Sequence, residues 1–364
     1  MKATFWCIAV ILIVSVGCSR KNFSFSNGAT ISKENFIDCF EPNLQSGGRE
    51  LWCEASAVCY DGTNLFLAND KDMPGAEASV FFLPYGKAGF GGSKPTYLFQ
   101  PLLKASQKFE DFATTPDRKH ALLTTGFDRT KENSSEWDSY NALIYWKTTA
   151  NPQDINPKIA HLQAGEKFSI SLRTALSRAL SNAEFPNGMP YFKIEGLAAT
   201  SGKLYFGVRE EGKKYDDFKY KVKVLTAPYQ FVEDSLAIAD NFQILADIDL
   251  NTLNPTIPKG LALSSIEYDA SRNIFWILTS LESSTQLNCA YLWWATEADL
   301  KMGKMNLVNE KATNQPLKFT HKAEDITIMG KNQLFIIHDD DRNKTKIGDK
   351  TRTPNQAAYS IITF

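Results

Sequence analysis

The sequence predicts an all-β fold, because one two-strand pattern recurs five times along its 364 residues. Each copy has a Glu or Ser, then a small or acidic residue and an apolar one, and a second apolar strand opens about ten residues later. The Glu-or-Ser positions are Ser56, Glu110, Glu195, Ser264 and Glu324. A tight turn joins the two strands, as at residues 201–202 (Ser-Gly). Five such hairpins in one chain predict a single β-propeller, with one hairpin at the centre of each blade.

The polar residues at the ends of these hairpins predict a site at one end of the propeller axis. A hairpin returns the chain to the end where it began, so the five Glu-or-Ser positions should meet at one mouth. Seven polar residues leave the second strands at the same end: Asn69, Asp70, Asp128, Arg209, Glu210, His338 and Asp339. Polar residues also mark solvated strand ends with no function. Recurrence in register in all five copies favours the mouth.

The N-terminus has the pattern of an export signal. Lys2 precedes an apolar run, residues 5–14, that is too short to span a bilayer, and small residues then lead to Cys18. This resembles a bacterial lipoprotein signal, in which the cysteine becomes the lipidated first residue, carrying palmitate or a similar chain. An ordinary secretory signal is the alternative. We therefore expect a signal peptide at 1–17, a flexible tether at 18–33 and the propeller at 34–364, on an outer-membrane lipoprotein of the cell envelope.

The net charge and the apolar content of the chain limit the classes of partner that we expect. The net charge is −1 and the basic residues are scattered, which argues against a nucleic-acid partner. No later apolar run is long enough for a transmembrane helix, so membrane contact would be through the lipid anchor only.

Of six cysteines, four remain after Cys7 is removed and Cys18 is lipidated, and an oxidising compartment permits a disulfide whose pairing the sequence leaves open. The four candidates are Cys39, Cys53, Cys59 and Cys289.

The first two blades have outer strands at 80–84, 97–100, 142–146 and 159–162. The spacing before the third blade is longer, and residues 169–183 carry apolar side chains at helical intervals, including Leu172 and Leu176. We expect one inserted amphipathic helix there, packed on a rim rather than closing the mouth. A degenerate sixth blade within 163–190 is the alternative to five blades.

The last three blades vary more. The charged residues 210–218 predict an exposed loop after the inner hairpin of blade 3, before strands at 220–225 and 242–248. Blade 4 has Ser264 where three others have Glu, and its Trp293 and Trp294 should pack between blades. Blade 5 ends in a strand at 358–364 and lacks a fourth, which the N-terminal segment 35–39 could supply and so close the ring.

Two segments carry a family resemblance. Residues 194–198 (Ile-Glu-Gly-Leu-Ala) with 204–209, and residues 54–58 with 65–70, resemble the phytase-like and DUF3616-type propellers of bacteria. In the calcium-dependent relatives, a Glu entering an innermost strand is a metal ligand. The resemblance therefore implies Glu110, Glu195 and Glu324 as calcium ligands.

Two functions stay open. The first is a surface-anchored propeller that binds a small molecule or surface ligand at its mouth without catalysis, through Arg209, Asn69, Asp70 and Asp128. The second is a calcium-assisted hydrolase of an ester or phosphoester, in which Asp339 helps hold the metal and His338 is the general base. No GxSxG, HExxH or P-loop motif occurs in the sequence, which lowers the expectation of serine-hydrolase, zinc-protease or nucleotide chemistry.

Overall fold

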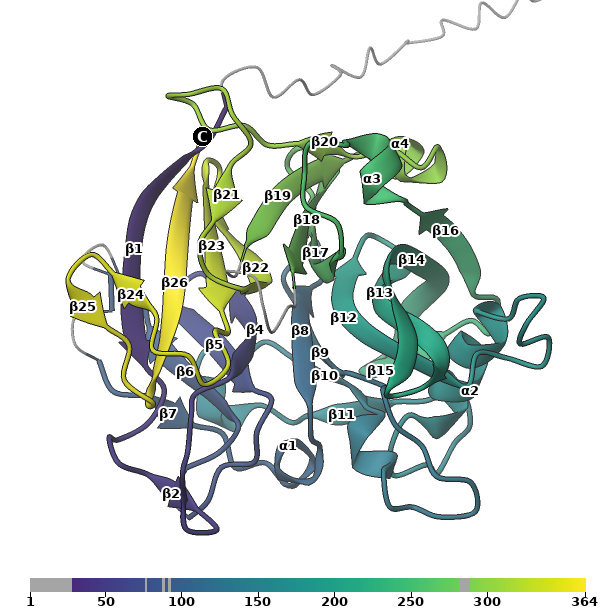
Figure 1. Ribbon diagram of the computed structural model, residues 1–364. Coiled ribbons are helices and arrows are strands. Elements are labelled where there is room, and N and C mark those ends of the chain that lie inside the picture. The colour runs from purple at the N-terminus through teal and green to yellow at the C-terminus, as the bar shows by residue number, and fades with distance from the viewer. Residues whose placement is uncertain (1–27, 76, 87–88, 91–92, 282–288) are drawn as a thin grey trace, which may run out of the picture.

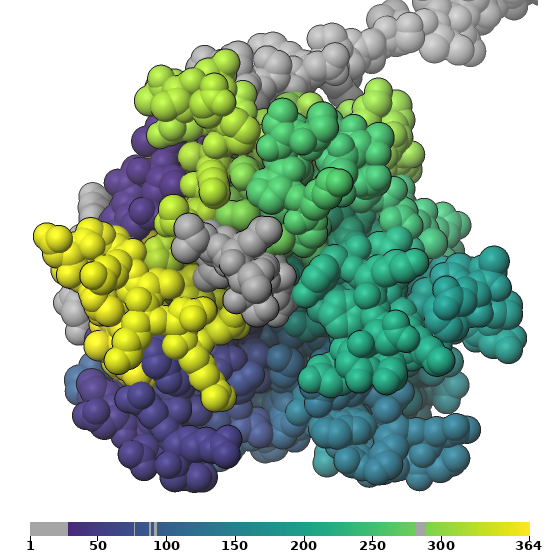
Figure 2. Space-filling view, in the orientation of Figure 1, coloured from purple at the N-terminus to yellow at the C-terminus, as the bar shows by residue number. Residues whose placement is uncertain are grey.

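A computed structural model describes residues 28–75, 77–86, 89–90, 93–281 and 289–364, and the predicted signal peptide and Cys18 lie outside them. The described residues form a single β-propeller of five blades, as predicted. Coloured segments follow one another around the face in chain order, so the C-terminal segment comes to lie beside the N-terminal one (Figure 2). The five innermost strands, β4, β8, β12, β17 and β22, contact one another in that order, and β22 contacts β4 to close the circle.

Blades 1 and 2 each have four antiparallel strands in chain order. Blade 1 comprises β4 (Ala55–Tyr60), β5 (Asn64–Asn69), β6 (Val80–Pro84) and β7 (Thr96–Tyr97). Blade 2 comprises β8 (Phe109–Thr114), β9 (His120–Thr125), β10 (Leu143–Lys147) and β11 (Lys158–Ala160). The predicted outer strands are therefore confirmed, with boundaries that differ by a few residues.

Blades 3 and 4 each carry an additional short strand. Blade 3 comprises β12 (Tyr191–Ala199), β13 (Lys203–Lys214), β14 (Asp217–Val232), β15 (Ser235–Ile238) and β16 (Gln243–Asp247). Blade 4 comprises β17 (Leu261–Asp269), β18 (Ile274–Leu281), β19 (Ala290–Ala295), β20 (Asn306–Leu307) and β21 (Lys318–Phe319).

The predicted exposed loop at 210–218 is correct only in part. Residues 213–217 are exposed and contain the turn at 215–216, but β13 and β14 extend to this turn, because Glu210 pairs with Tyr220 and Glu211 with Lys219. Glu211 also lies 2.6 Å from the ammonium of Lys223 and 3.0 Å from that of Lys221. The segment is therefore the end of a long hairpin, with an exposed charged tip.

Blade 5 is built from both ends of the chain. Its strands are β22 (Ala323–Gly330), β23 (Gln333–His338), β26 (Gln356–Thr363) and the N-terminal β1 (Thr30–Asp38). The strands β1 and β26 run antiparallel side by side (Figure 1). This confirms the predicted closure of the ring. The strand starts at Thr30, inside the segment predicted as tether, because Thr30 pairs with Thr363 and Ile31 with Ile362.

A disulfide reinforces this closure. It joins Cys39, just after β1 in blade 5, to Cys53, just before β4 in blade 1. Cys59 and Cys289 are free and buried. The structure thus selects one of the pairings that the sequence left open, and it is the one that links the last blade to the first.

Five hydrophobic clusters fill the gaps between neighbouring blades. The predicted amphipathic helix is α2 (Ile170–Ala179), whose Leu172 and Leu176 are buried between blades 2 and 3. Trp293 is buried between blades 3 and 4, and Trp294 packs between blades 4 and 5, as predicted. These clusters hold the innermost strands in fixed positions around the axis.

The remaining elements are short. They are α1 (Pro101–Ala105), η1 (Asp138–Tyr140), η2 (Pro152–Asp154), α3 (Leu250–Leu253), α4 (Glu297–Lys301) and two small hairpins, β2 (Gln45–Ser46) with β3 (Arg49–Glu50) and β24 (Lys346–Ile347) with β25 (Lys350–Thr351). Within the described residues, no helix has the length and apolar content needed to cross a membrane.

Candidate functional site at the axial mouth

A β-bulge interrupts every inner hairpin at the Glu-or-Ser position. The pairing register of the two innermost strands shifts at each of these residues: Ser56, Glu110, Glu195, Ser264 and Glu324. A bulge leaves its extra residue out of the ladder and redirects its side chain, and bulges are common next to binding sites. The recurring sequence signature is therefore the signature of a bulge that turns one polar side chain per blade toward the mouth.

In blades 2, 3 and 5 the bulge glutamate is held by a lysine. Lys193 pairs with the Glu195 carboxylate and lies 3.3 Å from Glu110 Oε1, so one ammonium joins blades 2 and 3. Lys322 lies 2.9 Å from Glu324 Oε1 in blade 5. The lysine side chains are 10–22% exposed and the three glutamates only 4–6%, so the ammonium groups are the more accessible half of each pair.

Arg209 fills the part of the mouth that belongs to blade 4. It is fully buried, and its Nη1 lies 3.1 Å from Glu195 Oε2. The same Nη1 donates hydrogen bonds to Ser264 Oγ at 3.1 Å and Ser280 Oγ at 3.2 Å. The guanidinium from blade 3 therefore compensates for the absence of a lysine and a glutamate in blade 4.

Blade 1 is joined to blade 2 by a further pair. Lys108 Nζ lies 2.6 Å from Asp70 Oδ2 and 3.9 Å from Glu110 Oε1. Lys71 Nζ lies 2.8 Å from Glu54 Oε2 and 3.3 Å from Asp70 Oδ2. Carboxylates and ammonium groups thus alternate from blade to blade around the mouth.

Burial and the neighbouring lysines shift the pKa values of these carboxyl groups in opposite directions. Burial raises the pKa of Glu110 to about 8, against the opposing effect of Lys193 and Lys108. Burial likewise raises the pKa of Glu324 to about 7, although Lys322 lowers it. For Asp70 the balance is reversed, because Lys108 and Lys71 outweigh burial and lower its pKa to about 2. Ionised and protonated carboxyl groups can therefore coexist in one small site near neutral pH.

Asp339 also belongs to the mouth. Burial raises its pKa well above the ordinary value, while the nearby Lys322 opposes the change and Glu324, Asp70 and Glu54 add to it. Its Oδ1 accepts a hydrogen bond from the backbone N–H of Asp341 at 2.8 Å. The structure therefore brings together Glu110, Glu195, Glu324, Arg209, Asp70 and Asp339 of the predicted site residues.

Three predicted residues have other surroundings. The Asn69 side-chain oxygen accepts hydrogen bonds from the N–H groups of Glu54 and Lys71, so Asn69 shapes the backbone at the mouth. Asp128 is buried near Glu110, and both carboxyl groups border the space that a side chain on Gly126 would fill. His338 is fully buried within blade 5, and its Nε2 is hydrogen-bonded to Ser360 Oγ at 2.7 Å.

The structure does not place His338 among the lysines, the arginine and the carboxylates of the mouth. Its ring lies 5.4 Å from that of His321, which is itself bonded to Asp340. Burial lowers the pKa of His338 to about 3, and His321 lowers it further while Asp340 opposes the change. His338 is therefore a neutral residue of the blade interior in this arrangement, and no described contact links it to the mouth glutamates.

Sequence reasoning missed the lysines. A Lys stands two residues before the bulge Glu in blades 2, 3 and 5, at Lys108, Lys193 and Lys322. Residues two apart on a strand share a face, so each lysine lies beside its glutamate. The repeated Lys-x-Glu spacing was visible in the sequence and could have identified the ion pairs.

Two aspartates connect the innermost strands to one another below the mouth. Asp325 Oδ2 accepts hydrogen bonds from the backbone N–H groups of Val58 at 2.6 Å and Phe112 at 3.2 Å. Asp111 Oδ2 accepts from Leu197 N–H at 2.9 Å and Ile266 N–H at 3.4 Å. Together these bonds involve all five innermost strands, so the aspartates have a structural role and form the floor of the mouth.

The groups around the bulge glutamates differ from the ligands of a calcium site. Calcium takes six to eight oxygen ligands. Among the described residues, no three His, Cys, Asp or Glu side chains are arranged to hold a metal ion. The bulge glutamates instead face Lys193, Arg209 and Lys322. Calcium binding at Glu110, Glu195 and Glu324 stays a prediction.

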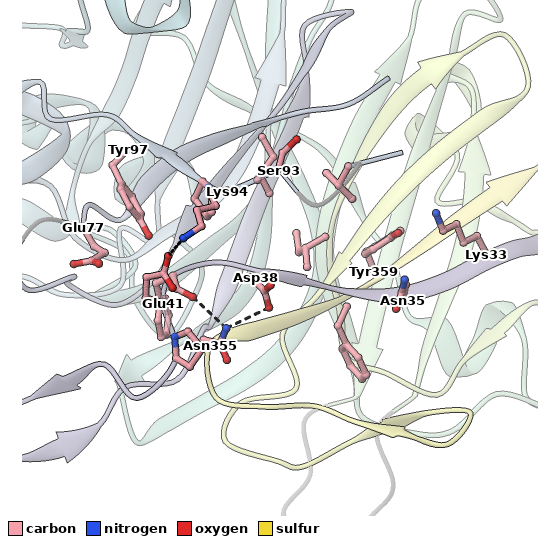
Figure 3. A pocket seen from close by; sticks show the side chains of 17 residues that line it. Lys33, Asn35, Asp38, Glu41, Glu77, Ser93, Lys94, Tyr97, Asn355 and Tyr359 are labelled. Carbon is pink, nitrogen blue, oxygen red and sulfur yellow. Dashed lines mark hydrogen bonds and ion pairs between the residues drawn. The ribbon is translucent and has the colours of Figure 1, made fainter. Parts of the chain in front are cut away.

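A separate groove of about 470 Å³ lies on the outside of the propeller, between β1 and blade 1. Figure 3 shows Lys94 reaching Glu41 across it, and Asn355 bonded to Asp38. The only buried polar side chain labelled there is that of Asn355, whose amide also donates to Phe40 O at 3.1 Å. Lys94 is paired with Glu41, and the Asn355 amide is used within the protein, so we place the candidate site at the mouth and not in this groove.

Comparisons with known proteins give only distant structural matches. No protein-family model and no curated protein sequence matches the chain. Among solved structures, an α-L-arabinofuranosidase from Podospora anserina aligns with 88% of this chain and 95% of its own at 11% identity, with a TM-score of 0.45. A glycoside hydrolase family 43 β-1,3-galactosidase aligns with 88% and 93% at 10% identity, with a TM-score of 0.42. A PQQ-bound aldose sugar dehydrogenase from Streptomyces coelicolor aligns with 90% and 98% at 11% identity, with a TM-score of 0.38.

Proposed function

We propose that this chain is a binding propeller whose axial mouth takes a small polyhydroxylated molecule. The observation that carries the proposal is the set of cations paired with carboxylates at the mouth in blades 1, 2, 3 and 5, supplied in large part by the β-bulges and the Lys-x-Glu pairs. No nucleophile or general base is part of the proposal.

This pairing of charges suits hydroxyl groups in particular. A hydroxyl both donates and accepts hydrogen bonds, so one hydroxyl can accept from Lys193 and donate to Glu195 or Glu110 without separating charges. Charge-assisted hydrogen bonds of this kind are stronger than neutral ones. A ligand with a single charge would instead leave one half of each ion pair without a partner, which is costly at a buried site.

The test is a calorimetric titration of the purified chain with D-glucose, D-galactose, L-arabinose and myo-inositol. We expect at least one of these to bind, and the Glu195→Gln variant to lose about tenfold or more in affinity, the loss of a charged hydrogen-bond partner. The matched control is Glu77→Gln in the outer groove, which should bind like the wild type. Binding that Glu195→Gln leaves unchanged would contradict the proposal.

Calcium-assisted hydrolysis of an ester or phosphoester is the alternative, and it rests on the resemblance to phytase-like and DUF3616-type propellers. Under it, Glu110, Glu195 and Glu324 would be the metal ligands. The lysine and arginine contacts of these glutamates favour the binding proposal over this alternative.

We also propose that the chain is exported and anchored by a lipid on Cys18. The pairing of Cys39 with Cys53 supports an oxidising compartment, because structural disulfides persist there. Metabolic labelling with an alkyne analogue of palmitate should label the wild type and fail to label Cys18→Ser. Labelling of both, or of neither, would contradict the anchor.

A further inference from the structure

A second hollow, of about 360 Å³, lies at the opposite end of the propeller axis from the mouth. Its lining comes from the turn ends of four inner hairpins, those of blades 1, 2, 4 and 5. Its lining includes Tyr60, Arg118, Glu267 and Tyr268. The volume falls at the lower end of the range for small-molecule sites, about 300–1,000 Å³.

Glu267 supplies a buried carboxylate to this hollow. It lies on β17 and is only 8% exposed. Among the described residues, no lysine or arginine lies within ion-pair distance of it, and no side chain donates a hydrogen bond to it. A buried carboxylate without a charged partner is costly, so it needs a ligand or a proton.

The neighbouring acidic groups are satisfied in a way that Glu267 is not. Asp269 Oδ2 lies 2.7 Å from Arg272 Nη1 and also accepts from the Trp276 indole N–H. Asp325 accepts hydrogen bonds from three backbone N–H groups and from Ser265. These two carboxylates cannot serve a ligand without breaking the fold.

The electrostatics agree with the geometry. Burial raises the pKa of Glu267 well above its ordinary value, and Asp325 and Asp269 raise it further. Arg118 opposes the shift. Arg118 and Lys331 both line the hollow, but both are exposed, whereas Glu267 is buried.

Two aromatic residues complete the lining. The Tyr60 hydroxyl donates to Gly62 O at 2.6 Å, and the Tyr268 hydroxyl donates to Asn273 Oδ1 at 2.8 Å. With the hydroxyls bonded elsewhere in the protein, the rings remain as the contribution of these residues to the hollow. Aromatic faces attract cations.

We propose that this hollow binds a small organic amine, with its ammonium group on the Glu267 carboxylate and its carbon skeleton against Tyr60 and Tyr268. An organic cation fits better than a metal ion, because Glu267 accepts a hydrogen bond only from the backbone of Tyr268 and is the one carboxylate of the hollow without an ion pair among the described residues. The site is separate from the mouth, where lysines and an arginine already balance the carboxylates.

The test uses benzylamine and its neutral analogue benzyl alcohol as probes of the purified chain, measured by saturation-transfer NMR. We expect benzylamine to bind at least tenfold more tightly than benzyl alcohol, and Glu267→Gln to abolish that difference. The matched control is Glu297→Gln, which alters a surface carboxylate paired with Lys203 and should keep the wild-type preference.

Circular dichroism of Glu267→Gln checks that it is folded, which we expect because the substitution removes a buried charge. Equal binding of the amine and the alcohol to the wild type would overturn the proposal. So would an amine preference that survives in Glu267→Gln. Loss of amine binding in Glu110→Gln, with Glu267→Gln unaffected, would place the amine at the mouth and also overturn it.

Discussion

The three glutamate blades and the two serine blades use the same bulge for different purposes. In blades 2, 3 and 5 the bulge glutamate lies with a lysine two residues earlier. In blade 1 the Ser56 hydroxyl donates to the backbone oxygen of Phe109, and in blade 4 Ser264 accepts from Arg209. One backbone feature thus builds a charged site in three blades and ties neighbouring blades together in the other two.

Removing the lysine of a glutamate blade should have the largest effect. Lys193→Met leaves Glu110 and Glu195 buried without the ammonium that they share, so we expect a loss of about 3–5 kcal/mol in the free energy of unfolding. Urea denaturation measures it. The matched control is Lys119→Met, which breaks an exposed pair with Asp117 and should cost about 1 kcal/mol or less. Equal losses in the two variants would remove the distinction between the blade classes.

The glutamate blades should also make stability depend on pH. Folded Glu110 has a pKa of about 8 against an ordinary 4.5, so between these values the folded state holds the proton more tightly than the unfolded chain. Stability therefore falls as pH rises through this window, and Glu110→Gln should flatten the fall. Unfolding by urea at a series of pH values measures both, and a wild-type curve that is already flat would contradict the prediction.

Asp70 gives the opposite dependence at acid pH. Its folded pKa of about 2 lies below the ordinary 3.8, so its contribution to stability is present above about pH 4 and is lost as pH falls toward 2. Asp70→Asn should lose stability at neutral pH and be less sensitive to acid than the wild type. The same urea series extended to low pH measures it, and an unchanged acid limb would rule out this role for Asp70.

A substitution in a serine blade should cost less stability than one in a glutamate blade. Ser56→Ala removes a hydrogen bond of 2.5 Å to the Phe109 carbonyl between blades 1 and 2, for which we expect about 1 kcal/mol. Saccharide binding should be unchanged, because the serine blades contribute no lysine-paired carboxylate. Loss of binding in Ser56→Ala would show that the serine blades belong to the site.

Calcium should have the smallest effect. Lys193, Arg209 and Lys322 already neutralise the bulge glutamates, so we expect the melting temperature of the chain to be the same with calcium and with a chelator. A calcium-dependent rise that is lost in Glu195→Gln and Glu324→Gln would instead support the metal-dependent alternative.

Much of the fold could be predicted because local pattern determines it. The Glu-or-Ser signature located all five inner hairpins, and the missing fourth strand of blade 5 predicted closure by the N-terminus. The long hairpin of blade 3 could not be predicted in this way, since its charged residues suggested a loop. The cross-strand pairing of Glu211 with Lys221 and Lys223 explains the buried part of this segment.

The sequence predicts which residues lie at the mouth but not which groups they contact there. Residues at strand ends can be assigned to the mouth from topology alone, yet whether a glutamate faces a metal or an ammonium depends on distances across blades. His338 illustrates the limit, because it leaves its strand at the correct end and still faces Ser360 and His321 inside its own blade. Glu267 was not among the predicted site residues, because the hollow around it depends on four turns that are far apart in the sequence.

A crystal structure of the chain grown with the saccharide or cyclitol that binds it would show where the ligand lies. We expect ligand density at the axial mouth, with hydroxyl groups within hydrogen-bond distance of Lys193 and of the Glu195 or Glu110 carboxylate. Density in the outer groove beside Lys94 and Glu41, or a mouth in which these ion pairs make no contact with the ligand, would contradict it.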